Sequence, residues 1–257
     1  RGIGVRPGTA DVTIENVRII DGGQRAIEVL NPQRALIRDV QIVGTSGIVG
    51  KEGDGIHIDG WATKQAPPCA KVSILDNYIE RPGDTAISAC YCSQVEISHN
   101  RIFGAAYFDK PASIEESGID LTGVREARVH DNQIWRIARY CGYASSYPDE
   151  QGVWRTPQDI YFERNFCSQF VEREEKLPGF YVVGNLSAPR QYASNIHFLN
   201  NRMIGFRGSA LLLVAAVKDF SIVSNDLRSQ NGIPIVIGSS PGRDVSNGIV
   251  RANQLGG

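Results

Sequence analysis

Short alternating hydrophobic segments, each followed by a polar turn, recur along the whole chain. A typical copy reads apolar-x-apolar-x-x-Asn-x-apolar, as at 72–79 and 95–102. Further copies cover 127–134, 160–166, 196–203, 220–227 and 249–255, and two variants centred on Asn16 and Asp39 precede them. From Asn77 onward, successive Asn residues are 23, 32, 33, 36, 24 and 28 positions apart. The shortest spacing indicates the length of a bare repeat, and the longer ones indicate loop insertions.

A second pattern, small-apolar-x-apolar, lies between these copies. It occurs at 26–29, 55–58, 86–89, 118–121, 180–183, 210–213 and 233–237. Each repeat therefore holds two or three short strands, and no segment keeps a 3.6-residue period. These features predict an all-β fold, a single-stranded right-handed parallel β-helix of about nine coils. We expect one domain over 1–257, forming part of a longer chain, and a rod roughly 45 Å long.

The recurring Asn has a physical explanation. Asn tolerates left-handed backbone angles, so it suits a fixed corner in every coil. Asn side chains that are stacked on successive coils can also hydrogen-bond to one another. We therefore expect a ladder of Asn residues along one corner of the rod.

Charge and composition exclude some classes of protein. The formal net charge is -1, which argues against general affinity for nucleic acid. No apolar run approaches the roughly 18 residues of a membrane span. Five cysteines are present, of which Cys90 and Cys92 would share one face of a strand. They lack the spacing of a zinc site, and we expect buried free thiols.

Candidate chemistry gathers on one face when the second pattern is aligned. Glu28, His57, Ser88 and Asp120 take the same outward position on successive coils. Three acids crowd the turn before that strand: Asp54, Asp84 and Glu116. Residues at one position of adjacent coils lie about 5 Å apart. Carboxyl pairs at about 5 Å or at roughly 6.5–9.5 Å serve retaining and inverting glycosidases respectively.

These residues predict a catalytic group made of Asp54, His57, Asp84, Glu116 and Asp120. In a hydrolase the acids cleave the glycosidic bond, and His57 carries a further proton. A lyase needs a base and a positive charge instead, from candidates such as His57, Lys51, Arg81, Arg101 and Arg125. Calcium held by Asp54, Asp59 and Asp84 is an alternative for a lyase. Otherwise we expect no metal and no cofactor.

Substrate contacts are expected from residues near these acids. Exposed aromatic rings and cations suit sugars, which favours the following set: Asp59, Trp61, Arg81, Arg101 and Tyr143. Long insertions mark the working face and are expected at 61–69, 104–116, 139–158 and 173–178. Ordinary structural roles remain open, because Asp before Gly often forms a turn, and Glu116 and Asp120 suit solvated edges.

The repeats resemble the pectate-lyase-like β-helix superfamily, which includes polygalacturonases, polysaccharide lyases, epimerases and phage tailspikes. Gly53-Asp54-Gly55 resembles the polygalacturonase Asn-Thr-Asp-Gly motif, and Gly83-Asp84-Thr85 resembles Gly-Asp-Asp with Thr85 in place of the second Asp. Glu116-Ser117-Gly118 stands where that family has Gly-His-Gly, and the Arg-Ile-Lys motif is missing. The resemblance implies a polysaccharide partner.

Three functions are compatible with these observations. The first is an extracellular enzyme that cleaves a polysaccharide, as a glycoside hydrolase or a lyase. The second is a polysaccharide C5-epimerase, which shares the first step of a lyase. The third is a non-catalytic fibre or tailspike segment that binds polysaccharide, and a homotrimer is possible. The resemblance implies an extracellular, periplasmic or virion-surface location.

Overall fold

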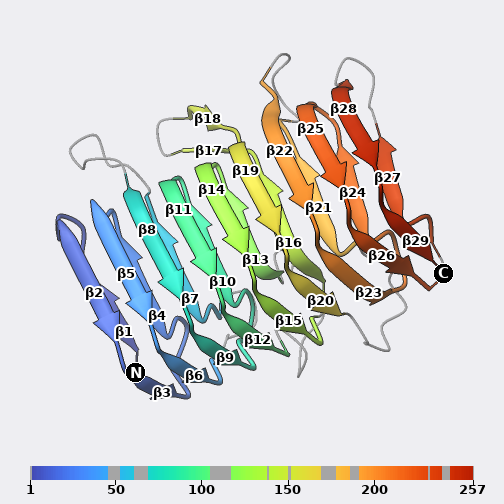
Figure 1. Ribbon diagram of the computed structural model, residues 1–257. Coiled ribbons are helices and arrows are strands. Elements are labelled where there is room, and N and C mark those ends of the chain that lie inside the picture. The colour runs from blue at the N-terminus through green and yellow to red at the C-terminus, as the bar shows by residue number, and fades with distance from the viewer. Residues whose placement is uncertain are drawn as a thin grey trace.

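In the described part of the chain, three parallel sheets, each of nine strands, wind around one core of the computed structural model (Figure 1). The structure describes residues 2–45, 53–60, 69–104, 117–137, 139–149, 152–168, 178–185, 191–230, 232–238 and 244–256. Strands of sheets A, B and C follow one another along the chain, so each round of three strands forms one coil. The prediction of a parallel β-helix of about nine coils is confirmed. Within the described residues, no helix has the length and hydrophobicity to cross a membrane.

The strand bounds follow the two sequence patterns. Sheet A contains β1 (Ile3–Val5), β4 (Ile27–Leu30), β7 (Ile56–Asp59), β10 (Ile87–Cys90), β13 (Ser117–Thr122), β16 (Tyr140–Ser145), β21 (Phe180–Val183), β24 (Leu211–Val214) and β27 (Ile235–Gly238). Sheet B contains β2 (Asp11–Glu15), β5 (Arg34–Arg38), β8 (Ala70–Leu75), β11 (Ser93–Ser98), β14 (Arg125–His130), β19 (Gln158–Glu163), β22 (Ala193–Leu199), β25 (Val217–Val223) and β28 (Val245–Arg251). Sheet C contains β3 (Arg18–Ile20), β6 (Gln41–Val43), β9 (Tyr78–Glu80), β12 (Arg101–Phe103), β15 (Gln133–Trp135), β20 (Phe166–Ser168), β23 (Arg202–Phe206), β26 (Asp226–Ser229) and β29 (Gln254–Gly256). A small antiparallel hairpin joins β17 (Tyr147–Pro148) to β18 (Trp154–Arg155).

The core is built from columns of apolar side chains that point inward from successive coils. Ile27, Ile56, Ile87 and Ile119 are paired in register on sheet A, and all four are fully buried. Side chains alternate between the two faces of a strand, so the residues between them point outward. Burying one such Ile contributes roughly 1.5–3 kcal/mol, which explains why this register is held from coil to coil.

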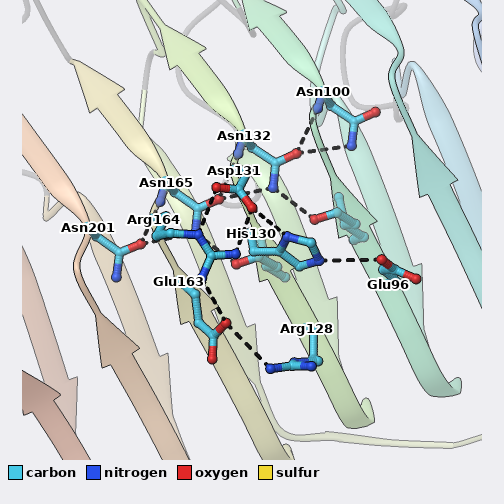
Figure 2. Close-up of polar contacts among 12 residues, drawn as sticks. Glu96, Asn100, Arg128, His130, Asp131, Asn132, Glu163, Arg164, Asn165 and Asn201 are labelled. Atoms are coloured by element: carbon cyan, nitrogen blue, oxygen red, sulfur yellow. Dashed lines mark hydrogen bonds and ion pairs between the residues drawn. The ribbon is translucent and has the colours of Figure 1, made fainter.

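A ladder of buried Asn side chains runs along the corner between sheets B and C, as Figure 2 shows. Asn100 Nδ2 donates to Asn132 Oδ1 at 3.0 Å, and the same oxygen accepts from the Asn100 backbone N–H. The pattern repeats from Asn77 to Asn253, and each Nδ2 in this series also donates to a carbonyl of the preceding coil. Buried polar groups need such partners, so the ladder fixes how each coil sits on the next.

The backbone role predicted for the ladder Asn is wrong. The left-handed φ belongs to the residue before it, for example 58° at His99 and 56° at Asp131. Asn16 and Asp39 also have left-handed φ angles of 56° and 52°, so they occupy this preceding position and are not ladder residues. In the second coil Val40 takes the ladder position, because its N–H donates to Asn77 Oδ1 at 3.0 Å. The ladder therefore depends on the Asn side chain, and the turn depends on its neighbour.

Ion pairs connect neighbouring coils outside the ladder (Figure 2). Arg164 Nη2 donates to Asp131 Oδ2 at 2.7 Å, and His130 Nδ1 lies 2.8 Å from the same carboxylate oxygen. The hydrogen bonds from Arg164, helped by His130, lower the pKa of Asp131 to about 2. Exposed pairs of this kind contribute little individually, so the network supports a register that the core and ladder already set.

Four of the cysteines form disulfides, which overturns the expectation of buried free thiols. Cys69 bonds to Cys92 and Cys141 bonds to Cys167, with Cα–Cα distances of 4.6 and 6.3 Å. Cys69 and Cys92 immediately precede β8 and β11, which are paired in register on adjacent coils. Stacking therefore brings them together although they are 23 residues apart.

Cys90 is the one free cysteine among the described residues. The prediction that Cys90 and Cys92 share one face of a strand is wrong. The strand ends at Cys90, and Tyr91 has a left-handed φ of 55° that turns the chain toward sheet B. Cys90 consequently points outward from sheet A, whereas Cys92 points into the core and is buried.

Candidate functional site

The outward column predicted on sheet A is present in the structure. Glu28 pairs with His57, His57 with Ser88, and Ser88 with Asp120. Tyr143 continues the same column on the next coil. The alternation of the Ile core explains this placement, because each of these residues stands beside an inward-pointing Ile or its equivalent. The sequence prediction of which residues share this face is confirmed, and their role is a separate question.

A pocket of about 400 Å³ opens over this column. Its walls come from the outward face of sheet A and from the turns before and after the strands of this sheet. Five of the residues expected at the site line it: Asp54, His57, Asp59, Asp120 and Tyr143. The remaining lining residues are Arg25, Thr85, Ser88, Cys90, Tyr91, Thr122, Ser145 and Tyr147. The structure therefore collects acids, a histidine and aromatic rings from several coils in one hollow.

His57 lies at the buried side of this pocket between two acids. Its Nδ1 is 2.9 Å from Asp54 Oδ2, and its Nε2 is 3.7 Å from Asp59 Oδ2. Neither contact has the alignment of a good hydrogen bond, and both are ion pairs. Asp54 also accepts from the Thr85 N–H at 3.3 Å and lies 3.8 Å from the Arg25 guanidinium. The imidazole is thus held by residues of its own strand and the turn before it.

The charge of His57 follows from this arrangement. Burial alone would lower its pKa, because the cation loses its hydration. The carboxylates of Asp54 and Asp59 outweigh burial and raise the pKa of His57 to about 9. His57 is therefore a cation at neutral pH, which makes it a proton donor or a fixed positive charge and not a base.

Asp120 supplies a carboxylate from β13, two coils away from His57. Its side chain is buried, and Thr122 Oγ1 donates to Asp120 Oδ1 at 3.0 Å. Thr122 in turn lies 3.0 Å from the Ser145 hydroxyl of the next coil. Two steps between parallel strands amount to about 9.6 Å. The acids on β7 and the acid on β13 therefore face the pocket from two separated positions.

Cys90 stands in the pocket between these acids, at the register position between Asp59 and Thr122. Burial and the nearby charges of Asp120 and Asp59 raise the pKa of the Cys90 thiol well above its usual value. The thiol stays protonated at neutral pH and is a poor nucleophile. Sequence reasoning missed this residue, although it follows Ser88 by two positions and therefore had to face the same side.

Arg25, Tyr91 and Tyr147 also line the pocket without having been predicted. Arg25 reaches it because the pairing of Ile27 with Ile56 sets Arg25 opposite Asp54. Burial raises the pKa of Tyr91 above its usual value, and the nearby Cys90 and acids add to the increase. The strand register predicts the position of Arg25 at the pocket. Tyr91 and Tyr147 lie in a turn and a hairpin, which have no periodic pattern, so their positions are known only from the structure.

Other predicted residues do not meet at this pocket. Asp84 is buried beside it, one register position away from Asp54, and its N–H donates to the Gly53 carbonyl at 3.1 Å. Arg81 follows β9 and pairs with Glu80 at 3.6 Å, and Arg101 begins β12, so both belong to sheet C. Trp61, Glu116 and Lys51 lie outside the described residues.

Tyr143 reaches the pocket from a strand and not from a loop. The insertion expected at 139–158 contains β16, so the Tyr- and Ser-rich segment continues sheet A. Tyr143 stacks on Tyr140 and Tyr181 with ring centroids 5.4 and 5.5 Å apart. Burial raises the pKa of Tyr143 to about 12, so its hydroxyl remains a hydrogen-bond donor. The three rings stack into an aromatic wall, and Tyr143 is the member of this wall that lines the pocket.

The acids do not form a ready calcium site. Within the part of the chain that the structure describes, no three His, Cys, Asp or Glu side chains cluster as metal ligands. Asp84 does not line the pocket with Asp54 and Asp59, so the predicted trio is not assembled. The calcium alternative stays a prediction.

Comparisons with known proteins agree with this architecture. A family model described as "Right handed beta helix region" matches residues 1–147. A mutant of the tailspike protein of E. coli bacteriophage HK620 aligns over 96% of this chain and 50% of its own, with a TM-score of 0.58 and 13% identity. This chain therefore spans half the length of that tailspike chain. A search of curated proteins found no significant match.

Two further solved structures show weaker likeness. The surface protein and adhesin PfbA of Streptococcus pneumoniae aligns over 95% of this chain and 66% of its own, with a TM-score of 0.44 and 12% identity. The endo-xylogalacturonan hydrolase from Aspergillus tubingensis aligns over 98% and 81%, with a TM-score of 0.41 and 10% identity. At such identities the likeness concerns the fold, so any function must be argued from the pocket.

Proposed function

We propose, for a chain that belongs to the right-handed beta-helix family, that the pocket on sheet A hydrolyses glycosidic bonds of a polysaccharide. One observation carries this proposal. The pocket contains the carboxylates of Asp54, in the turn before β7, of Asp59, at the end of β7, and of Asp120, on β13. It also holds the His57 cation. Glycoside hydrolysis needs two carboxyl groups on opposite sides of the bond that breaks.

In the proposed mechanism, the Asp120 carboxylate accepts a proton from the water whose oxygen bonds to the anomeric carbon. On the other side of the pocket, Asp54 passes the proton that it shares with the His57 cation, 2.9 Å away, to the leaving oxygen as the glycosidic bond breaks. Asp59 holds the other side of the His57 ring at 3.7 Å. The two sides are two coils apart, about 9.6 Å between strands, which is close to the upper limit of the carboxyl separation in inverting enzymes and far above that in retaining ones. Sugar rings on either side of the bond would rest on the Tyr143 wall and on Tyr91.

A lyase or an epimerase is less well supported by the same residues. Each would need a base together with a positive charge that neutralises a uronate carboxylate. Among the described residues, the cations that line the pocket are His57 and Arg25, and both already lie beside Asp54. Arg81 and Arg101 do not line it. Elimination and epimerisation therefore remain alternatives, of which an assay for new absorbance near 235 nm detects elimination.

The proposed location is extracellular, periplasmic or on a virion surface. Two disulfides support it, because such bonds persist mainly in oxidising compartments. The homotrimer stays a prediction, and light scattering after size exclusion would test it.

The experiment is a pair of assays on a panel of polysaccharides with wild type, Asp120→Asn and Asp39→Asn. Reducing ends that appear without absorbance near 235 nm, and that Asp120→Asn loses, would support hydrolysis. Asp39 is exposed and has a left-handed φ that Asn also tolerates, so Asp39→Asn is the matched control. New absorbance would indicate a lyase. If wild type produces neither reducing ends nor new absorbance, cleavage is refuted and an epimerase or a binding protein is favoured.

A further inference from the structure

A second hollow, of about 310 Å³, lies around the corner from the pocket, where the strands of sheet B begin. We call it the basic hollow, and the side chains that matter in it are Arg125, Trp154, Arg155, Gln158, Tyr192 and Lys218. Arg125, Gln158 and Lys218 belong to one register column on β14, β19 and β25. No Asp or Glu is among its described lining residues.

The β17–β18 hairpin stands between the basic hollow and the pocket on sheet A. Tyr147, on β17, lines the pocket, whereas Trp154 and Arg155, on β18, line the basic hollow. The Tyr147 and Trp154 rings lie 6.5 Å apart. The Tyr91 hydroxyl donates to the Pro148 carbonyl at 3.2 Å, which ties the hairpin to the rod. A ligand that crosses this hairpin would occupy both hollows.

The charges of the basic hollow are only partly compensated. Arg155 Nη2 pairs with the buried Asp149 at 3.0 Å, and Lys218 lies 4.0 Å from Asp219. Arg125 differs, because its Nε donates to the neutral amide oxygen of Gln158 at 2.9 Å and it forms no ion pair within the described residues. A guanidinium fixed in place by an amide and lacking a carboxylate is prepared to bind one from a ligand.

Aromatic rings flank these cations. Lys218 Nζ lies 5.8 Å from the centre of the Tyr192 ring, and Trp154 borders the same hollow. Rings of this kind pack against the apolar faces of sugars, while Gln158 offers hydrogen bonds to hydroxyl groups. The combination of a cation without a carboxylate partner and aromatic walls fits an acidic sugar better than a free inorganic ion.

We propose that the basic hollow binds a carboxylate-bearing sugar residue of the polysaccharide, with Arg125 as the main contact to the carboxylate. This inference rests on the proposed function for the identity of the ligand as a polysaccharide, and it narrows the substrate to an acidic one. The bond to be cleaved lies on the other side of the hairpin, so the acidic residue is a neighbour of the cleaved linkage and not the sugar that reacts.

The test is affinity electrophoresis in native gels that contain polygalacturonate, alginate or hyaluronate, with carboxyl-reduced polygalacturonate and dextran sulfate as comparisons. All proteins carry Asp120→Asn so that cleavage does not alter the gel. We expect at least one uronate polymer to retard the protein and its carboxyl-reduced form to have little effect. Arg125→Ala and Lys218→Ala should weaken retardation about tenfold, as expected when a charged contact is lost.

Arg18→Ala is the matched control, because Arg18 is an exposed cation on sheet C, far along the chain from the basic hollow. If no uronate polymer retards the protein, or if Arg125→Ala behaves like Arg18→Ala, the inference is wrong. Equal retardation by dextran sulfate that Arg18→Ala also weakens would indicate general attraction to polyanions and would likewise overturn it. Specific retardation of the Asp120→Asn protein, together with a wild type that cleaves nothing in the polysaccharide assays, would refute the proposed hydrolysis alone. Cleavage of neutral polymers by wild type without specific retardation of the Asp120→Asn protein would refute this inference alone.

Discussion

Nδ1 of His57 lies 2.9 Å from Oδ2 of Asp54, and both side chains are almost completely buried. The pair links the catalytic proposal to the stability of the fold. A buried cation that is balanced by two acids adds stability only while it keeps its proton. The pH dependence of unfolding should therefore report on this contact directly.

The first prediction concerns that pH dependence. The pKa of His57 rises from an ordinary 6.5 to about 9 on folding, so its contribution is complete below pH 6.5 and is lost as the pH rises to 9. The contribution is on the order of 3 kcal/mol. Urea unfolding should show a difference between wild type and His57→Gln that shrinks over this range.

His197→Gln is the control for this experiment. Burial lowers the pKa of His197, so its protonation changes below pH 6.5 and its difference from wild type should stay constant between pH 6.5 and 9. A constant difference for His57→Gln over the same range would show that the imidazole is not charged in the folded protein.

The second prediction concerns stereochemistry. Because Asp120 is two coils from Asp54 and Asp59, the two sides are too far apart for a retaining hydrolase, and we expect an inverting one. Proton NMR of fresh products should show the anomer opposite to that of the substrate. Asp54→Asn should lower the rate by roughly 100-fold or more, whereas Asp84→Asn should have a much smaller effect. Retention of configuration would place the two acids closer than this register allows.

The third prediction concerns the Asn ladder. Asn132→Ala removes the acceptor of the Asn100 side chain and backbone and the donor to the Ile97 carbonyl. Leaving these buried groups without partners should lower the free energy of unfolding by about 2–4 kcal/mol. Asn253→Ala should cost much less, because water can reach that half-buried end of the ladder. Urea unfolding compares the two variants, and equal losses would contradict the ladder's role.

The fourth prediction concerns the thiols. The unfolded, unreduced protein should titrate one free thiol per chain, that of Cys90. Cys69→Ser should lower stability by about 3 kcal/mol, because the disulfide closes a loop that spans 23 residues. Five titratable thiols would show that neither pair is bonded. In the presence of a reducing agent, wild type should have the same free energy of unfolding as the double variant Cys69→Ser and Cys141→Ser.

The sequence predicted those features that repeat. The Asn spacing and the alternating Ile residues define the coil, and their register alone aligns His57 with Ser88 and Asp120. Features that depend on irregular turns could not be read in the same way. Tyr91 turns the chain between Cys90 and Cys92, so adjacent cysteines face opposite sides. The hairpin that carries Tyr147 gives no periodic signal, and its position at the pocket emerged only from the fold.

The unbroken Asn ladder makes the axial spacing between coils independent of the number of residues in each coil. Its members are from 23 to 36 residues apart, yet the hydrogen bonds between them are alike, at 2.9 to 3.0 Å. Extra residues are therefore absorbed outside this corner without altering the pitch of the rod. A chain built this way can exchange its surface segments, and with them its ligand, while its axial spacing stays constant. Replacing the whole segment between two ladder residues by that of another such chain should therefore transfer the ligand specificity of that segment.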